Sequence, residues 1–165
     1  RRSSDLKMDN RMKSEAILSV DRKYRYVLTR TWDETLPNIM FVGLNPSTAD
    51  ETTDDPTIRR CINFAKSWGY GGLYMVNLFA YRSTNPNNIR IVDNPIGDNN
   101  DSYISHYAKL SDKVVACWGN RGSYQKRSKE VTNLLEEIYC FGQNKSGEPK
   151  HPFYLKKEIS LIKYK

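Results

Sequence analysis

Three largely apolar runs constrain the fold of this chain more than any other feature. They occupy residues 39–44 (IMFVGL), 73–79 (LYMVNLF) and 113–118 (KVVACW). Runs without polar alternation are typical of strands that are buried on both faces. Segments with helical periodicity separate them, and this alternation predicts an α/β fold in which helices cover both faces of a parallel sheet.

The expected elements follow from these runs and from the capping residues between them. We expect a three-layer α/β/α domain with a four-stranded parallel central sheet, its strands lying near residues 39–44, 73–79, 113–118 and 138–141. Helices are predicted at about residues 56–68, 101–110 and 124–138. Asp55 is a suitable N-cap for the first helix, and Pro56 suits its first position. In the last helix, Val131, Leu134 and Leu135 are expected to point inward.

An N-terminal β-hairpin is predicted ahead of this sheet, because two strand-like segments flank a polar turn at residues 21–23. Tyr24, Tyr26 and Leu28 occupy alternate positions, which indicates a half-exposed hairpin. Residues 1–13 have no apolar periodicity and are expected to form a disordered basic segment. The length of 165 residues suits one domain, which we place at residues 14–165.

The formal net charge of +7 is concentrated at the two ends of the chain. Residues 14–142 hold equal numbers of acidic and basic side chains, so the body of the chain is neutral. Basic ends can bind phosphate backbones through counterion release. They can equally serve solubility alone, and charge does not choose between the two interpretations.

Other sequence features exclude several classes of protein. No apolar run approaches the ~20 residues of a membrane span, and no signal peptide opens the chain, so we expect no membrane partner. The three cysteines are widely spaced and form no CxxC pair, which argues against a disulfide framework or a zinc site. We therefore expect a cytoplasmic protein without metal or organic cofactor, whose cysteines are packed in the interior.

Polar or turn-forming residues lie at or just past the end of each expected strand, at the sheet edge where parallel α/β folds bind ligands. They are Gly43, Asn45, Pro46 and Ser47 after the first strand, Asn77 in the second, Asn120 after the third and His151 after the fourth. Amide and imidazole groups at one edge can read a planar heterocycle through donors and acceptors. Each also has a structural interpretation, such as closing a turn or capping a strand end. The motifs GxGxxG and GxxxxGK[ST] do not occur, which excludes dinucleotide-binding and P-loop sites of those types.

These residues resemble the motifs of the uracil-DNA glycosylase superfamily. GLNPS is similar to its water-activating motif, and the His-Pro of HPFYL is similar to its second catalytic motif. The resemblance implies that Asn45 holds the attacking water, Asn77 recognises a base edge and His151 donates to a base oxygen. It also implies that Leu155, together with Tyr154, supports a flipped-out nucleotide.

Departures from the superfamily pattern lower the activity that we expect. An amide at Asn45 cannot take a proton from water, so it can only position the nucleophile. Residues 47–49 are Ser-Thr-Ala, where the most active branch has an aromatic residue and a histidine. HPFYLKK also lacks the Ser-Pro-Leu-Ser sequence of the usual wedge loop. The resemblance therefore implies weak or specialised base excision.

A closer resemblance covers residues 16–163. GLNPSTADETTDDPTIRRC, WGYGGLYMVNLFAYRST, CWGN and KHPFYL are similar to the hallmarks of domain of unknown function 1643, a bacterial and phage family. The name of that family implies no activity.

The resulting hypothesis is a protein that recognises a nucleobase in DNA or in a nucleotide, and that hydrolyses the N-glycosidic bond of a modified or deaminated base. The alternatives are a non-catalytic module that binds a nucleobase, nucleotide or nucleic acid, and a phage-encoded protein that binds a host partner. The catalytic candidates are Asn45 and His151, and the base-binding candidates are Gly43, Pro46, Ser47, Asn77, Phe79 and Asn120. The nucleic-acid-binding candidates are Arg59, Arg60, Arg82, Lys145, Lys150, Leu155 and Lys156. A salt bridge to Asp54 is an alternative role for Arg59 and Arg60.

Overall fold

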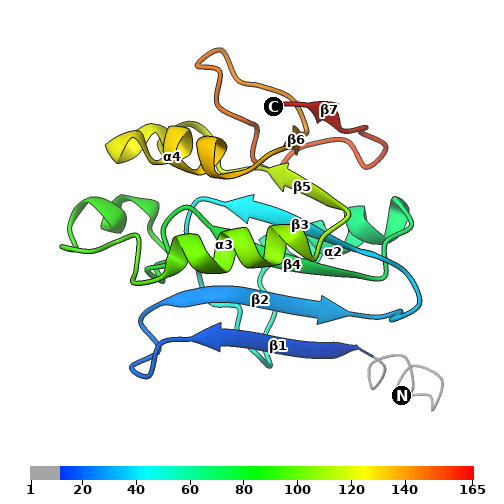
Figure 1. Ribbon diagram of the computed structural model, residues 1–165, viewed down its shortest axis with the longest axis horizontal. Coiled ribbons are helices and arrows are strands. Elements are labelled where there is room, and N and C mark those ends of the chain that lie inside the picture. The colour runs from blue at the N-terminus through cyan, green and yellow to red at the C-terminus, as the bar shows by residue number, and fades with distance from the viewer. Residues whose placement is uncertain (1–11) are drawn as a thin grey trace.

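The computed structural model describes residues 12–165, which form one seven-stranded sheet with helices packed against it (Figure 1). The strands are β1 Lys13–Leu18, β2 Arg25–Thr31, β3 Asn38–Gly43, β4 Gly72–Asn77, β5 Lys113–Ala116, β6 Tyr139–Cys140 and β7 Ile162–Lys163. The helices are α2 Pro56–Ser67, α3 Asn100–Lys109 and α4 Arg127–Leu134, with 3-10 segments η1 Pro86–Arg90 and η2 Asn120–Lys126. Of the predicted disordered segment, residues 1–11 lie outside the described residues, whereas Lys13 begins β1.

The sheet is mixed, in the order β1-β2-β4-β3-β5-β6-β7. β3 pairs in parallel with β4 and β5, and β5 pairs in parallel with β6. The predicted hairpin forms from β1 and β2, but β2 also pairs antiparallel with β4 and so extends the same sheet. β7 adds an antiparallel strand beside β6. The α/β class is confirmed, but the sheet is larger than predicted and is not purely parallel.

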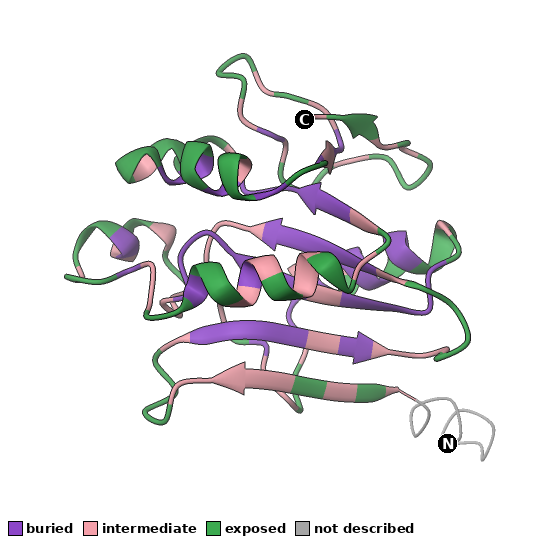
Figure 2. Cartoon of the chain, viewed as in Figure 1, coloured by how far each residue is buried: buried purple, intermediate pink, exposed green. Residues whose placement is uncertain are grey.

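β2 is buried along most of its length, which corrects the prediction of a half-exposed hairpin for this strand, whereas β1 is partly exposed. Val27 and Leu28 point to opposite faces of the sheet, yet both are fully buried. Neighbouring strands lie at both edges of β2, and Figure 2 shows it mostly buried beside the more exposed β1. β2 is thus an interior strand of the sheet.

Two apolar cores lie on the two faces of the sheet. In one, Ile104 of α3 and Val131 of α4 pack with strand residues such as Met40. In the other, Cys61 of α2 packs with strand residues such as Phe41. Helices therefore cover both faces, as predicted, with α2 on one side and α3 and α4 on the other.

The helices agree with prediction at α2 and differ at α4. Asp55 caps α2, since its Oδ1 accepts a hydrogen bond of 2.9 Å from the Ile58 amide. The helix predicted over 124–138 is restricted to α4, because Gln125 and Lys126 adopt left-handed φ angles of 55° and 58° that interrupt it. Leu134, which was expected to point inward, is 41% exposed near the helix end.

The sequence-based exclusions can be compared with the described residues. All three cysteines are free and buried, as expected. Within residues 12–165, no three His, Cys, Asp or Glu side chains cluster in a way that could hold a metal ion. None of the helices in this part of the chain is long and apolar enough to cross a membrane.

Candidate functional site

A cavity of about 770 Å³ lies at the carboxyl ends of β3, β4 and β5. The segment that follows β6 forms a further wall, so the cavity is bounded by loops that are far apart in the sequence. Its volume falls within the ~300–1,000 Å³ that is usual for small-molecule sites. The predicted site residues that line it are Gly43, Asn45, Pro46, Ser47, Asn77, Asn120, Lys150, His151 and Leu155.

Other predicted site residues do not line this cavity. They are Phe79, Arg59, Arg60, Arg82, Lys145 and Lys156. Phe79 is fully buried in one core, where its ring packs 5.9 Å from that of Tyr124, so it cannot stack on a ligand in the cavity. Arg59, Lys145 and Lys156 are exposed, and their contact with nucleic acid stays a prediction.

Two of the predicted phosphate-binding arginines donate to backbone carbonyls of the protein instead. Arg82 donates to the carbonyl oxygens of Ser47 and Thr48, both at 3.3 Å. Arg60 donates to the carbonyl oxygens of Pro152, at 2.7 Å, and Leu155, and so holds the segment after β6 against α2. The salt bridge to Asp54 that was considered for Arg59 and Arg60 does not form within residues 12–165, because Asp54 pairs with Arg30. The guanidinium groups of Arg60 and Arg82 thus shape the walls of the cavity.

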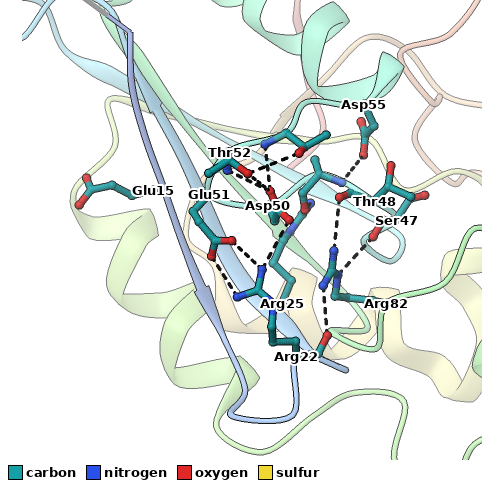
Figure 3. Close-up of polar contacts among 12 residues, drawn as sticks. Glu15, Arg22, Arg25, Ser47, Thr48, Asp50, Glu51, Thr52, Asp55 and Arg82 are labelled. Carbon is teal, nitrogen blue, oxygen red and sulfur yellow. Dashed lines mark hydrogen bonds and ion pairs between the residues drawn. The ribbon is translucent and has the colours of Figure 1, made fainter. Parts of the chain in front are cut away.

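The loop between β3 and α2 is held by four arginines, and we call residues 47–54 the clamped loop. Arg30 donates to the carbonyl oxygens of Asp50 and Thr53 at 2.6 and 3.1 Å. Arg22 donates to the carboxylate of Glu51 at 2.6 Å, and Figure 3 shows the guanidinium groups of Arg22 and Arg82 turned toward this loop. Arg25 reaches it from the cavity side, donating to the carbonyl oxygen of Ala49 at 3.1 Å.

Asn77 presents a hydrogen-bond donor to the cavity. It ends β4, is only 4% exposed, and lines the cavity. Its Oδ1 accepts a hydrogen bond of 3.2 Å from Nη2 of Arg25. Because a guanidinium can only donate, the amide oxygen must face Arg25, and this fixes the assignment of the two amide atoms. Nδ2 makes no hydrogen bond within residues 12–165, so it is free to donate to a ligand.

Gly43 leaves room for this amide. A Cβ atom built at residue 43 would lie 2.9 Å from Nδ2 of Asn77, closer than such atoms normally approach. Gly43 and Asn77 are direct partners in the parallel register of β3 and β4. The glycine predicted as a base-binding residue therefore acts at this edge by making space for the side chain of Asn77.

Asn45 is held by two carbonyl groups. Its Nδ2 donates to the carbonyl oxygens of Ser83 at 3.0 Å and Pro46 at 3.2 Å. These bonds fix the amide, and Oδ1, which makes no hydrogen bond within the described residues, remains as an acceptor. A carboxylate at this position would set oxygen against oxygen, so the local structure favours the amide.

His151 lies at the exposed rim of the cavity. Its Nδ1 accepts a hydrogen bond of 3.2 Å from the Phe153 amide, which places the proton of the neutral ring on Nε2. Partial desolvation lowers the pKa of His151 below its usual value, so the neutral ring is favoured near neutral pH. His151 can therefore offer an Nε2–H donor at the cavity mouth.

The residue that projects from the rim is Tyr154, rather than Leu155. Leu155 is half-buried and packs against the core beneath α2 while it lines the cavity. Tyr154 is fully exposed, lines the same cavity and has a left-handed φ of 64°, which is uncommon for a tyrosine. A side chain that inserts between bases must extend into solvent and not be packed against the protein, and the exposed ring of Tyr154 meets this requirement.

The outer wall is a polar loop tied to the end of β5. Oδ1 of Asn120 accepts hydrogen bonds from Nδ2 of Asn144 at 3.1 Å and from Oγ of Ser146 at 2.6 Å. Nζ of Lys150 donates to Oδ1 of Asn144 at 3.4 Å and lies on the cavity wall. The side-chain oxygen of Asn120 is therefore used within the protein, whereas its Nδ2 remains as a donor for a ligand.

Sequence reasoning missed several residues that line the cavity, among them Arg25, Asp55 as a wall residue, and Trp118. Trp118 is 2% exposed, and its Nε1 donates to Oε1 of Glu148 at 2.9 Å. Arg25 belongs to a strand that was expected to lie outside the sheet, which hid its approach to Asn77. A charged residue within the Tyr24–Tyr26 run was the signal available, since interior strands rarely carry an unexplained charge.

Comparison with known proteins assigns the chain to a family. A family model described as "Protein of unknown function (DUF1643)" matches residues 25–153, which span the cavity as far as Phe153. No curated protein and no solved structure matches the chain. The match covers most of the chain and confirms the resemblance to that family, over a shorter range than the expected 16–163.

Proposed function

The chain belongs to the DUF1643 family of proteins of unknown function, and we propose from its cavity that it recognises a nucleobase, in DNA or in a nucleotide, in a way similar to uracil-DNA glycosylases. The proposal rests mainly on the geometry of Asn77. This buried amide accepts a hydrogen bond from Arg25 through its oxygen, and its Nδ2 is left to donate to a ligand. Such a donor recognises a carbonyl oxygen of a base and disfavours an exocyclic amino group at the same place.

The reaction we propose is hydrolysis of an N-glycosidic bond. Oδ1 of Asn45 accepts a hydrogen bond from the water whose oxygen bonds to C1′ of the sugar. The bond from C1′ to the base nitrogen breaks, and its electron pair passes to the base, whose carbonyl oxygens gain negative charge. Nδ2 of Asn77 and Nε2–H of His151 stabilise that charge, while the proton of the water passes to solvent.

The cavity favours departure of the base over activation of the water. Asp55 is the only carboxylate among the described residues that line it. Its oxygens already accept hydrogen bonds from the amides of Ile58 at 2.9 Å and Ala49 at 3.4 Å, so the carboxylate is engaged in capping α2 and holding the loop before it. We therefore expect slow excision that depends on stabilising the leaving base.

The surroundings of the cavity agree with this proposal. The parallel pairings of β3, β4, β5 and β6 bring the ends of the strands to one edge, as a glycosylase-like arrangement requires. Tyr154 projects from the rim and would occupy the space that a flipped-out nucleotide leaves in a duplex.

A panel of oligonucleotides tests the proposal. Single- and double-stranded oligonucleotides with uracil, hypoxanthine, hydroxymethylated or glucosylated bases are incubated with the protein, and abasic product is measured. Asn77→Ala is expected to lower both binding and turnover, whereas Asn45→Ala is expected to lower turnover by about 10²–10³ with little change in affinity. Asn87→Ala, which removes an exposed amide outside the cavity, is the matched control.

The outcomes separate the two hypotheses. Product formation that is lost in Asn45→Ala and kept in Asn87→Ala supports the glycosylase. Binding that depends on Asn77 without product supports the non-catalytic module. Binding that is unchanged by Asn77→Ala contradicts both, since neither then uses the cavity.

A further inference from the structure

Arg25 is a buried cation with too few partners. Its side chain is 2% exposed, and its five N–H groups make one hydrogen bond to the carbonyl oxygen of Ala49 and one to Oδ1 of Asn77. Its Nε has no partner, and it forms no ion pair with a carboxylate within residues 12–165. Both partners that it has are neutral oxygens, so the guanidinium charge is not balanced locally.

The surroundings do not compensate for this burial. Desolvation lowers the pKa of Arg25 to about 10. The nearby cations Arg82 and Arg30 add to this shift, and the carboxylates of Asp55 and Asp50 oppose it without cancelling it. A buried ion without a counter-ion is costly, and proteins retain one chiefly where a ligand or a function uses it.

The lining of the cavity as a whole also carries net positive charge. Among the charged residues that line the cavity, Arg25, Arg121 and Lys150 are cations and Asp55 is an anion. Nδ2 of Asn77 adds a neutral donor next to Arg25. Arg25 and Asn77 therefore offer hydrogen-bond donors and one positive charge at the inner end of the cavity, within a lining whose net charge is positive.

We propose that an oxyanion of the ligand, a phosphate or a carboxylate, binds at the inner end of the cavity and supplies the counter-ion of Arg25. It would accept hydrogen bonds from the guanidinium of Arg25 and from Nδ2 of Asn77. This inference goes beyond recognition of a neutral base and stands whether or not the ligand contains one. Guanidinium groups bind oxyanions in preference to neutral acceptors because each hydrogen bond is then assisted by charge.

Two pairs of probes isolate the anionic group, and calorimetry and thermal unfolding measure its effect. Uracil is compared with orotate, which adds a carboxylate to the same ring, and uridine with uridine 5′-monophosphate, which adds a phosphate. Inorganic phosphate is tested alone. We expect the anionic member of at least one pair to bind about tenfold tighter or more, which the energy of a charged hydrogen bond allows. A gain for only one pair identifies which oxyanion the site takes.

Asn77→Asp is the sharpest variant. It places a carboxylate where Oδ1 now lies 3.2 Å from Nη2 of Arg25, and so supplies the counter-ion from within the protein. We expect its melting temperature to rise and the advantage of the anionic probes to disappear. Lys129→Gln makes the same change in net charge at an exposed position of α4 outside the cavity and is expected to keep that advantage.

Arg25→Met removes the cation together with its hydrogen bonds to Ala49 and Asn77 but keeps the Asn77 side chain, so it gives a second route to the same result. Equal affinities for the charged and neutral members of both pairs would overturn the inference, and so would an anion advantage that persists in both Arg25→Met and Asn77→Asp. If uracil and uridine bind without such an advantage, the inference fails and the proposed recognition of a base survives. If phosphate or orotate binds while uracil and uridine do not, the inference of an oxyanion site survives and the proposed recognition of a base fails.

Discussion

Two arginines of β2 differ in how completely the protein uses them. Arg30, 1% exposed, donates to Asp54 and to the carbonyl oxygens of Asp50, Thr53, Thr29 and Glu15. Arg25 is equally buried but contacts two neutral oxygens and leaves its Nε unpaired. Both side chains contact the clamped loop. On its outer side, the hydrogen-bonding groups of Arg30 find partners within the protein, whereas on its cavity side Arg25 keeps unused N–H donors.

The difference separates a structural role from a role in binding. A side chain whose hydrogen-bonding groups are all used within the chain stabilises the fold and has little left for a ligand. A buried side chain with unused donors beside a cavity is a candidate for ligand contact. By this criterion Arg30, Arg60 and Arg82 belong to the architecture, and Arg25 and Asn77 to the site.

The largest expected effect comes from replacing the two arginines of β2 in turn. Arg30→Met should lower the free energy of unfolding by about 3 kcal/mol, because it leaves Asp54 and several buried carbonyl groups without partners. Arg25→Met should change it by less than about 1 kcal/mol, since removing an unbalanced charge offsets the lost hydrogen bonds. Urea unfolding measures the free energy of unfolding of both variants. Equal losses in the two would contradict the distinction between a structural Arg30 and a ligand-binding Arg25.

A smaller effect is expected at Asn45, where the structure requires an amide. Asn45→Asp should lower the free energy of unfolding by about 2 kcal/mol, because a carboxylate would face the carbonyl oxygens of Ser83 and Pro46. Thermal unfolding at neutral pH measures this, with Asn87→Asp as the control. A stable variant with faster base excision would instead show that a general base at this position is tolerated and useful.

The exposed rim should respond in the opposite direction. Tyr154→Gly is expected to raise the free energy of unfolding by about 1 kcal/mol, since glycine adopts the left-handed φ of 64° without strain. If Tyr154 supports a flipped nucleotide, the same variant weakens binding to duplex oligonucleotides. Lower stability without any change in binding would assign Tyr154 to packing alone.

The smallest effect concerns pH. Because desolvation lowers the pKa of His151 in the folded protein, the unfolded chain binds more protons as the pH falls through about 6.5, and stability decreases toward acid. A ring-proton NMR titration should give a midpoint below about 6.5. His151→Gln should remove this contribution, and a midpoint above the usual value would contradict the neutral ring.

Strand and helix positions were predictable where local pattern decides them. The buried runs gave β3, β4 and β5 within a few residues, and Asp55 with Pro56 fixed the start of α2. The edge of the sheet was not predictable in the same way, because pairing between β2 and β4 depends on residues distant in the sequence. The interruption of the last helix at Gln125 was also not predicted, because a residue other than glycine in the left-handed conformation has no clear sequence signature.

The candidate site was predictable as a location but only partly as a set of contacts. Parallel strands bring their carboxyl ends together, which is why Asn45, Asn77 and His151 line one cavity. The roles of the arginines depend on which backbone carbonyl groups lie within hydrogen-bonding distance. These groups are distant in the sequence, so a short motif cannot predict them. Arg60 and Arg82 therefore looked like phosphate ligands, while Arg25 was missed.

The most direct test of this account is the side-chain amide signal of Asn77 in a proton–nitrogen NMR spectrum. The protein is titrated with uridine 5′-monophosphate, and the variant Asn77→Ala identifies the signal. We expect the Nδ2 protons to shift progressively and to saturate, because they donate to the ligand. An unchanged Asn77 signal, either without any binding or alongside saturating shifts confined to residues outside the cavity, would contradict the account.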